Sequence, residues 1–470
     1  MKKIIAVILC SVCCGFAATA QNYSLQQLKD SALQNNIAIR TARLGIDAAS
    51  QQRKEAFTKY FPNISGTGLW FNANKGMAQT SINASEMMPA ELGATMAQSL
   101  PAEALAVLAN PISISMLKNG TIGALTAVQP VFAGGQIVYG NKLAKVGEDV
   151  SRLQLRLSEN EVEKTTELYY WQLVSLQEKM NTLDAVEALL ADISKDVNVA
   201  VRAGVAMRND LLQVQLRQND VASQRLKLQN GLSIVRLLLA QYCGLSDHEK
   251  LRVKNEDFAT AHVDEFNADT ALSGTETTVA ADSSSFILHS SLNNLPEFQL
   301  LEKQVEATNL QRKMAVGKNL PSVAVGAGYN YHNLLDRDHT FGMVFATVSV
   351  PISDWWGGSH AVKRSKIEHE KAQEQLADNA ELLLIRMQNA RNAVEESRQQ
   401  LLLALRSIEQ TEENLRLNRN YYNAGTTKMS DLLEAQLLYQ QSLDKKTDAF
   451  ADYQNKLLEY RQASGLGVEW

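Results

Sequence analysis

The sequence has few cysteines and few prolines for its length. Of 470 residues, 4 are cysteine and 8 are proline. Three of the cysteines lie within the first twenty residues, so Cys243 stands alone in the rest of the chain and no intrachain disulfide is possible there. Its neighbours are apolar, which predicts a buried structural thiol. Scarce proline, together with abundant Ala, Leu, Gln and Glu, predicts long helices.

Other absences narrow the function. No stretch beyond the N-terminal region approaches 18 uninterrupted apolar residues, so no transmembrane helix is predicted, although an exported chain can still enter a membrane as β-strands. The net charge of −5 gives no reason to expect nucleic-acid binding. The 7 histidines form no metal-ligand spacing, and no nucleophile motif or phosphate loop is present. The sequence therefore predicts no enzyme, metal site or cofactor.

The first twenty residues have the pattern of a secretory signal. Lys2-Lys3 precedes an apolar run from Ile4 to Val12, and Ala18-Thr19-Ala20 supplies small residues for cleavage. We therefore expect an exported protein whose mature chain begins near Gln21.

One stretch occurs twice. The frame of Tyr421 to Gln436 recurs from Val201 to Gln215, with glycine, aspartate, Leu-Leu and a final glutamine at an offset of 221 residues. This recurrence predicts an internal duplication. Each copy reads as a helix that ends at a positive-φ glycine, followed by a new helix with an N-cap and a first-turn acid. These positions are Gly204, Asn209 and Asp210 in the first copy and Gly425, Ser430 and Asp431 in the second.

Each half also has a helical pattern that ends before a proline and is followed by twofold alternation. The clearest strand alternates apolar residues with small or polar ones, which predicts one apolar face. We assign four of its residues to a lipid-facing surface, namely Val323, Val325, Tyr329 and Tyr331. Asn333 to Asp338 is predicted as a turn, with Asp336-Arg337-Asp338 solvated instead of binding a cation.

Long heptad-like patterns complete each half. Gly134-Gly135 and Gly357-Gly358 are interpreted as hinges between strand and helix. After each pair, apolar residues step by fours and threes for some sixty residues, which predicts an antiparallel coiled coil roughly 90 Å long. The insertion from Lys75 to Lys118 is interpreted as a partly helical loop at a hairpin tip, exposed to solvent in preference to forming a plug.

The fold class is therefore mixed α and β, with two internal repeats. The predicted boundaries are a signal peptide at 1–20; a first repeat at 21–250, with a helix at 24–59, strands at 63–74 and 119–129, an insertion at 75–118 and helices at 136–201 and 206–242; a linker or equatorial segment at 251–291; and a second repeat at 292–470, with a helix at 294–318, strands at 322–332 and 341–350, and helices at 359–422 and 429–463.

Four membrane-length strands cannot close a barrel, and lipid tolerates no open sheet edge. The chain must then oligomerise. A closed barrel normally needs at least about eight strands, so two or more chains are required, and three would give twelve strands. A ring of coiled-coil pairs would enclose a tube with a hydrophilic inner wall. The pattern thus predicts a pore with a long soluble conduit.

With these features in place, the sequence resembles the TolC family of outer-membrane efflux proteins over essentially the whole mature chain. The resemblance rests on the duplicated order of elements, the Gly-Gly pairs, the turn from Gly425 to Gln436, and the strand-flanking residues Pro62, Pro321, Pro130 and Pro351. It implies a homotrimer with a twelve-stranded outer-membrane barrel and a periplasmic α-helical tunnel. It also implies a periplasmic adaptor and an inner-membrane transporter of the RND, ABC or MFS type as partners.

The resemblance further assigns site residues. Asp431 and Glu434 match the acidic constriction of the family, Tyr422 matches a tyrosine of its closing contacts, and Asp210 matches their polar partner. Where the family often has a basic residue, this chain has Thr427, with Lys428 or Arg202 as substitutes. The residues expected to dock the adaptor are Gly204, Gly425, Arg202 and Lys428. The usual Asn-Pro near the first helix is Asn36-Ile37 here.

These expectations describe an outer-membrane channel of a tripartite efflux or type I secretion system, which passes small toxic molecules, drugs or proteins. The alternative is a secreted coiled-coil adaptor without a pore. That alternative explains the heptads but not the two amphipathic hairpins.

Overall fold

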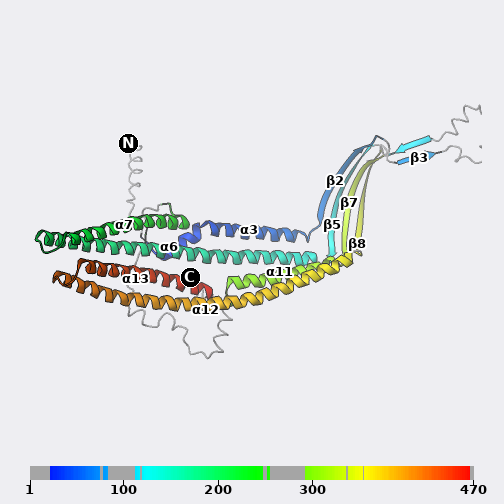
Figure 1. The fold of residues 1–470 in the computed structure, drawn as a ribbon. Helices are drawn as coiled ribbons and strands as arrows, with labels where there is room; N and C mark the ends of the chain where they lie inside the picture. Colours follow the sequence, from blue (N-terminus) through cyan, green and yellow to red (C-terminus); the bar gives the residue numbers. More distant parts are fainter. Residues whose placement is uncertain are drawn as a thin grey trace, which may run out of the picture. The chain divides into compact units, whose positions relative to one another are not determined.

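The computed structural model describes residues 22–74, 78–82, 112–116, 119–246, 251–253, 292–334, 337–352 and 354–465 (Figure 1). The predicted signal peptide, the centre of the insertion and most of the linker lie outside these residues. The chain divides into a helical unit, Met1–Ala49, Gly147–Val305 and Lys371–Trp470, and a strand-containing unit, Ser50–Val146 and Glu306–Glu370. Each unit therefore draws on both halves of the sequence.

Two helical hairpins lie mostly in the helical unit. In the first, α6 (Gln136–Arg202) is followed by α7 (Arg208–Cys243), and in the second α12 (Asp354–Asn423) is followed by α13 (Met429–Ala463). Buried residues recur at heptad spacing, as expected for coiled-coil packing. They include Leu183, Leu190 and Val197 on α6, Val214, Val221 and Val235 on α7, and Met387, Val394 and Leu401 on α12.

The first helical segment differs from its prediction as one helix over 24–59. It is divided into α2 (Leu25–Asn35) and α3 (Ile37–Thr58). Asn36 is extended, with φ −62° and ψ 137°. Its side chain accepts a hydrogen bond from the Ala38 N–H at 2.8 Å and donates one to the Tyr242 carbonyl at 3.1 Å. An asparagine side chain that bonds nearby backbone competes with the helix, so the break forms without a proline.

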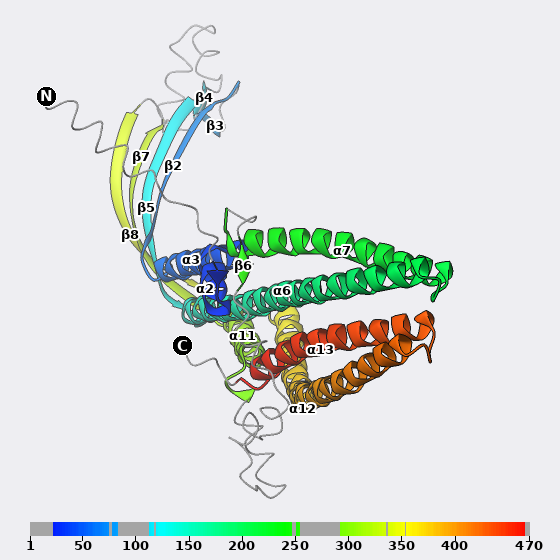
Figure 2. The ribbon, with the colours of Figure 1, turned by 90° about the vertical axis from the view of Figure 1, so that its left-hand side faces the viewer.

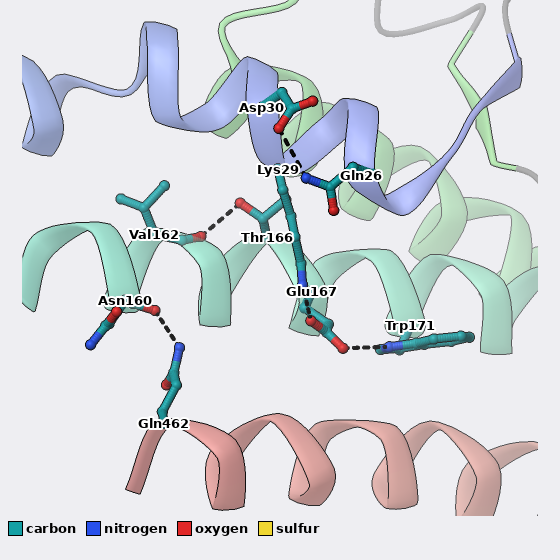
Figure 3. A network of polar contacts seen from close by, with 9 residues as sticks. All are labelled: Gln26, Lys29, Asp30, Asn160, Val162, Thr166, Glu167, Trp171 and Gln462. Carbon is teal, nitrogen blue, oxygen red and sulfur yellow. Dashed lines mark hydrogen bonds and ion pairs between the residues drawn. The ribbon is translucent and has the colours of Figure 1, made fainter. Parts of the chain in front are cut away.

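A mainly apolar core joins α2 to the hairpins and includes one buried ion pair (Figure 3). Lys29 Nζ on α2 lies 2.6 Å from Glu167 Oε2 on α6, and the Trp171 indole donates to Glu167 Oε1 at 3.3 Å. Burial, partly offset by Lys29, raises the pKa of nearby Glu163. Cys243 lies in the same core, where burial raises the pKa of its thiol to about 12. The predicted structural cysteine is confirmed.

The other unit contains an antiparallel sheet in the order β2-β5-β7-β8 (Figure 2). Its strands are β2 (Asn63–Asn72), β5 (Asn119–Ala133), β7 (Ser322–Leu334) and β8 (Arg337–Ser349). The predicted turn from Asn333 to Asp338 is too wide, because these two residues, like Leu334 and Arg337, are cross-strand partners in the ladder. The predicted end at Pro130 is also wrong, since β5 continues past a register shift between Pro130 and Phe132.

The two faces of this sheet differ in composition. The valine face carries Val323, Val325, Tyr329 and Tyr331 of β7, Val344 and Val348 of β8, Leu125 of β5 and Trp70 of β2, as the strand register requires. Val344 is 87% exposed on this face. The opposite face is more mixed and includes a hydrogen bond between the Ser65 and Thr126 hydroxyls at 3.0 Å. The valine face is therefore an exposed surface with several large apolar side chains.

The two Gly-Gly pairs differ in conformation. Gly134 and Gly135 precede α6 with φ of 59° and 78°. Gly357 and Gly358, in contrast, lie within α12, so the predicted hinge there is wrong. A Cβ on Gly358 would overlap the side chain of Asn319, which follows α11 (Pro296–Lys318), so glycine here permits close packing.

Gly134 takes part in a reciprocal backbone contact. A Cβ on Gly134 would overlap the carbonyl oxygen of Gly317 in α11, and a Cβ on Gly317 would overlap the carbonyl oxygen of Gly134. Both residues must lack a side chain for the chain to approach so closely.

Smaller strands lie in the predicted insertion and linker. The described parts of the insertion are β3 (Ala78–Ile82) and β4 (Ile112–Met116), an antiparallel pair where a partly helical loop was predicted. At the start of the linker, β6 (Arg252–Val253) pairs in parallel with β1 (Asn22–Tyr23). None of the described helices has the length and apolarity needed to cross a membrane.

Candidate functional site

The candidate site is formed by the two turns that close the helical hairpins. Gly204 and Gly425 have φ of 76° and 75°, as predicted for glycine C-caps. The glycine N–H bonds to the carbonyl three residues earlier, Val201 at 3.1 Å and Tyr422 at 2.9 Å. The next N–H bonds five residues back, to Ala200 at 3.0 Å and Tyr421 at 2.9 Å. Both turns therefore have the Schellman hydrogen-bond pattern.

The new helices begin earlier than the predicted N-caps Asn209 and Ser430. The N-cap residues are Met207 and Lys428, because an acid at the third helical position accepts a hydrogen bond from each N-cap backbone. Asp210 Oδ2 accepts from the Met207 N–H at 3.1 Å, and Asp431 Oδ2 accepts from the Lys428 N–H at 3.4 Å. The two predicted site aspartates thus have one local geometry.

Asp431 has additional partners. Its carboxylate accepts from the Thr427 hydroxyl at 2.7 Å and from the Ser430 hydroxyl at 3.1 Å. These bonds, Thr427 first, lower the pKa of Asp431. Thr427, which stands where the resembled family often has a basic residue, is therefore a hydrogen-bond donor to Asp431. The positive charge of Lys428 also lowers the pKa of Asp431, but by less than these hydrogen bonds do.

Tyr422 is half-buried where the two hairpins meet. It packs against a cluster formed by Ile193, Val197, Val214, Met429 and Leu432. Burial raises the pKa of the Tyr422 phenol, and the charge of Asp210 adds to this shift. The structure therefore brings Tyr422 and Asp210 of opposite hairpins near each other.

The remaining predicted residues are exposed. Glu434 shares the exposed face of α13 with Asp431, three residues before it, while the intervening Leu432 is buried. Arg202 and Lys428 are exposed beside their turns. Within the described chain, no hydrogen bond or ion pair joins either basic side chain to Asp210 or Glu434.

The sequence reading missed a polar ladder between the hairpins. Arg217 of α7 donates from Nε to Gln436 Oε1 at 3.1 Å and from Nη2 to Gln440 Oε1 at 2.7 Å. Gln440 donates in turn to Gln224 Oε1 at 2.9 Å. Gln436 is fully buried, and burial lowers the pKa of Arg217. The available signal was Gln436 itself, a polar residue at a seam position.

Part of the chain matches a known protein family. Residues 287–466 match the family described as Outer membrane efflux protein. This region is an outer membrane efflux protein domain. No curated protein sequence matches the chain significantly. The efflux domain includes the second turn, with Tyr422, Asp431 and Glu434, and the β7–β8 hairpin.

Solved structures extend the similarity to nearly the whole chain. The CmeC outer membrane channel of Campylobacter jejuni is 15% identical, with a TM-score of 0.70, and the match covers 94% of this chain and 85% of that one. VceC of Vibrio cholerae is 13% identical, with a TM-score of 0.69 and coverage of 94% and 96%. The open state of the Neisseria gonorrhoeae MtrE channel is 16% identical, with a TM-score of 0.68 and coverage of 94% and 88%.

These matches establish a shared fold. The predicted mixed α and β fold and the resemblance to TolC-family channels are therefore confirmed. The matched family is described as one of efflux proteins, which agrees with the prediction that the chain is not an enzyme.

Proposed function

We propose that the chain is one protomer of an outer-membrane channel in a tripartite export system. The main observation in support is the β2-β5-β7-β8 sheet. Within the described chain, its edge strands β2 and β8 each pair with a neighbour on one side only. Its valine face is apolar and exposed, so it suits lipid, whereas two open edges do not. Closing the sheet with neighbouring copies satisfies both requirements.

A homotrimer is the assembly that the resemblance to TolC-family channels favours. Three sheets of four strands supply twelve, above the roughly eight that a closed barrel needs. Three pairs of hairpins would then continue as a helical tunnel on the periplasmic side of the outer membrane. The substrates would be small toxic molecules, drugs or proteins delivered by an inner-membrane transporter.

Cysteine crosslinking between edge strands tests the assembly. Because the Cys243 thiol is buried and its pKa is raised, it should not react in the folded protein, so crosslinks can be assigned to the introduced cysteines. Thr67→Cys on β2, combined with single cysteines scanned over 341–345 on β8, should give dimers and trimers in outer-membrane preparations. Ala124→Cys on the central strand β5, with the same scan, is the matched control and should give none.

A stable monomer in detergent, or a protein released from membranes by salt and alkaline washing, would contradict the barrel. The second result would favour the secreted coiled-coil adaptor.

An arginine on the valine face tests its contact with lipid. Val325→Arg should destabilise the barrel by roughly 2–4 kcal/mol if the site lies near the bilayer midplane, because the charge must leave water. Tyr329→Arg should act in the same direction. Thr347→Arg on the opposite face is the control, since Thr347 pairs with Ala324 across the ladder. Heat stability of the assembled protein is the measurement, and equal stability of Val325→Arg and Thr347→Arg would show that the faces are misassigned.

The two turns are proposed as the periplasmic tip. Val205 and Met207 of the first turn are 80% and 74% exposed, which offers an apolar contact to a periplasmic adaptor. The Gly204 and Gly425 caps hold the turns, and Arg202 and Lys428 supply charge beside them.

The second turn is also proposed to line the constriction. Asp431 and Glu434 share one exposed face, so threefold symmetry would gather six carboxylates around the axis. Such a ring would favour cations in a narrow pore. Tyr422 and Asp210, which lie close together, would stabilise the closed arrangement of the two hairpins.

A further inference from the structure

Two histidines form a stacked pair near the end of the β7–β8 hairpin. His332 and His339 are direct cross-strand partners. Their ring centroids are 5.3 Å apart and their planes differ by 6°. The antiparallel register creates this pair, which linear ligand spacing does not reveal.

The pair lies on the face opposite the valine face. His332 follows Tyr331 directly, and neighbouring residues of a strand point to opposite faces. Phe341 lies on the same face, with its ring centroid 6.3 Å from that of His332 and 6.1 Å from that of His339. The two imidazoles are thus held by the strand ladder and by one aromatic neighbour.

Polar atoms around the pair lack partners. His332 Nδ1 is buried and makes no hydrogen bond within the described chain. Asn330, two residues earlier on the same face, has its Nδ2 atom buried without a hydrogen-bond partner. Buried polar atoms are normally satisfied, so these two atoms on one face are candidates for contact with a bound ligand: an imidazole nitrogen that can coordinate a metal ion and an amide that can donate a hydrogen bond.

We propose that His332 and His339 bind a divalent transition-metal ion of the class that imidazole prefers, Cu²⁺, Ni²⁺ or Zn²⁺. Metal–nitrogen bonds of about 2.0–2.1 Å place two neighbouring imidazole nitrogens about 3 Å apart. The ring centroids, 5.3 Å apart, are close enough for a shared ion, but both imidazoles must turn about χ2 so that one nitrogen of each points toward it. Water completes the coordination, and the Asn330 amide donates to that water.

The ligand count fits a weak, open site. No group of three or more His, Cys, Asp or Glu side chains suited to a metal occurs among the residues whose structure is described. Closed structural zinc sites have four protein ligands, so a two-histidine site exchanges its ion readily. The competing explanation is a purely aromatic contact among His332, His339 and Phe341.

Copper binding distinguishes the two explanations. The full-length protein, purified in detergent without a polyhistidine tag, is titrated with Cu²⁺ and followed by electron paramagnetic resonance. The wild type should show one site more per chain than the His332→Gln/His339→Gln variant, with coupling to two nitrogens. Each single variant should weaken this site by at least about tenfold, since even loss of an outer-shell partner costs roughly 10–100-fold.

His360→Gln is the matched control, because His360 is exposed on α12, far along the sequence from the pair. It should leave the two-nitrogen signal unchanged. Identical Cu²⁺ titrations and spectra for the wild type and the double variant, with circular dichroism confirming that both are folded, would overturn the proposal in favour of an aromatic contact.

A second measurement relates the site to the pore and rests on the proposed function. In planar bilayers, micromolar Cu²⁺ should reduce conductance of the wild type more than that of the double variant. A protein that binds Cu²⁺ through the pair but forms no pores would refute the channel and leave the metal site standing. A conducting protein whose Cu²⁺ binding is insensitive to both histidines would refute only the site.

Discussion

The turn at Gly204 and the turn at Gly425 share their backbone hydrogen bonds, their positive-φ glycine and their acid at the third helical position. Their side chains differ. The first turn exposes Val205 and Met207, whereas the second surrounds Asp431 with hydroxyl groups. The two turns therefore share one backbone structure but present different surfaces, apolar in the first turn and acidic with hydroxyl donors in the second.

The largest expected effect tests what the turns share. Gly204→Val and Gly425→Val should each destabilise their hairpin by about 1–3 kcal/mol, because a β-branched residue resists positive φ. A Cβ meets no atom within 4 Å at either position, so the cost is conformational and should be similar in both turns. Thermal unfolding and protease cleavage at the turns are the measurements.

Gly231→Ala within α7 is the control for an added Cβ, which there has only an ordinary 3.7 Å contact with Leu176. This change should be neutral or stabilising. If one valine variant lost clearly more stability than the other, the two turns would not share the same conformational cost at the glycine.

The next prediction concerns the apolar surface of the first turn. Val205→Ser with Met207→Ser should weaken adaptor binding by about tenfold, since exposed apolar area would be lost while serine keeps the N-cap competent. Thr426→Ala with Thr427→Ala in the second turn should weaken it less. The measurement is the affinity of each double variant for the purified adaptor. Equal losses would mean that both turns dock the adaptor, and no loss in either would place docking elsewhere.

The smallest expected effect concerns the acids of the second turn. Asp431→Ala with Glu434→Ala should weaken cation selectivity and divalent block in planar bilayers, because the exposed carboxylates of α13 would no longer face the pore. Glu409→Ala, which removes an exposed acid of α12 outside the second turn, is the control. If selectivity and block were unchanged in a correctly folded double variant, the acids would act only at the helix N-terminus.

This selectivity should also depend on pH. The pKa of Asp431 is below its ordinary value of 3.8, chiefly because of the Thr427 hydroxyl, so its charge persists to more acidic pH than that of a free carboxylate. The Asp431 contribution to cap stability and to selectivity should be complete above the ordinary pKa and disappear as pH falls through the lowered value.

Periodicity in the sequence was sufficient for the long elements. Heptad spacing predicted the seam, and α13 begins and ends where predicted, at Met429 and Ala463. The break at Asn36 was missed, because the apolar pattern continues through it and because the Asn36 side chain, besides its local bond to the Ala38 N–H, bonds to Tyr242, 206 residues away. A local pattern carries no information on such a partner.

The site shows the same limit. The glycine caps and first-turn acids are local features, and the sequence identified them. The Arg217–Gln436 bond joins two hairpins, and the His332–His339 pair depends on strand register, so neither follows from spacing along the chain. Contacts between residues that are distant in the sequence could be identified only from the structure.

The Gly134–Gly317 contact has a consequence for variant libraries of this chain. Each glycine is excluded from gaining a side chain by the backbone of the other, and no residue smaller than glycine exists to compensate. A second mutation therefore cannot rescue the first, unlike a crowded pair of side chains. Selected libraries should retain glycine at both positions, while Gly140 and Gly147, which have open space around them, vary freely.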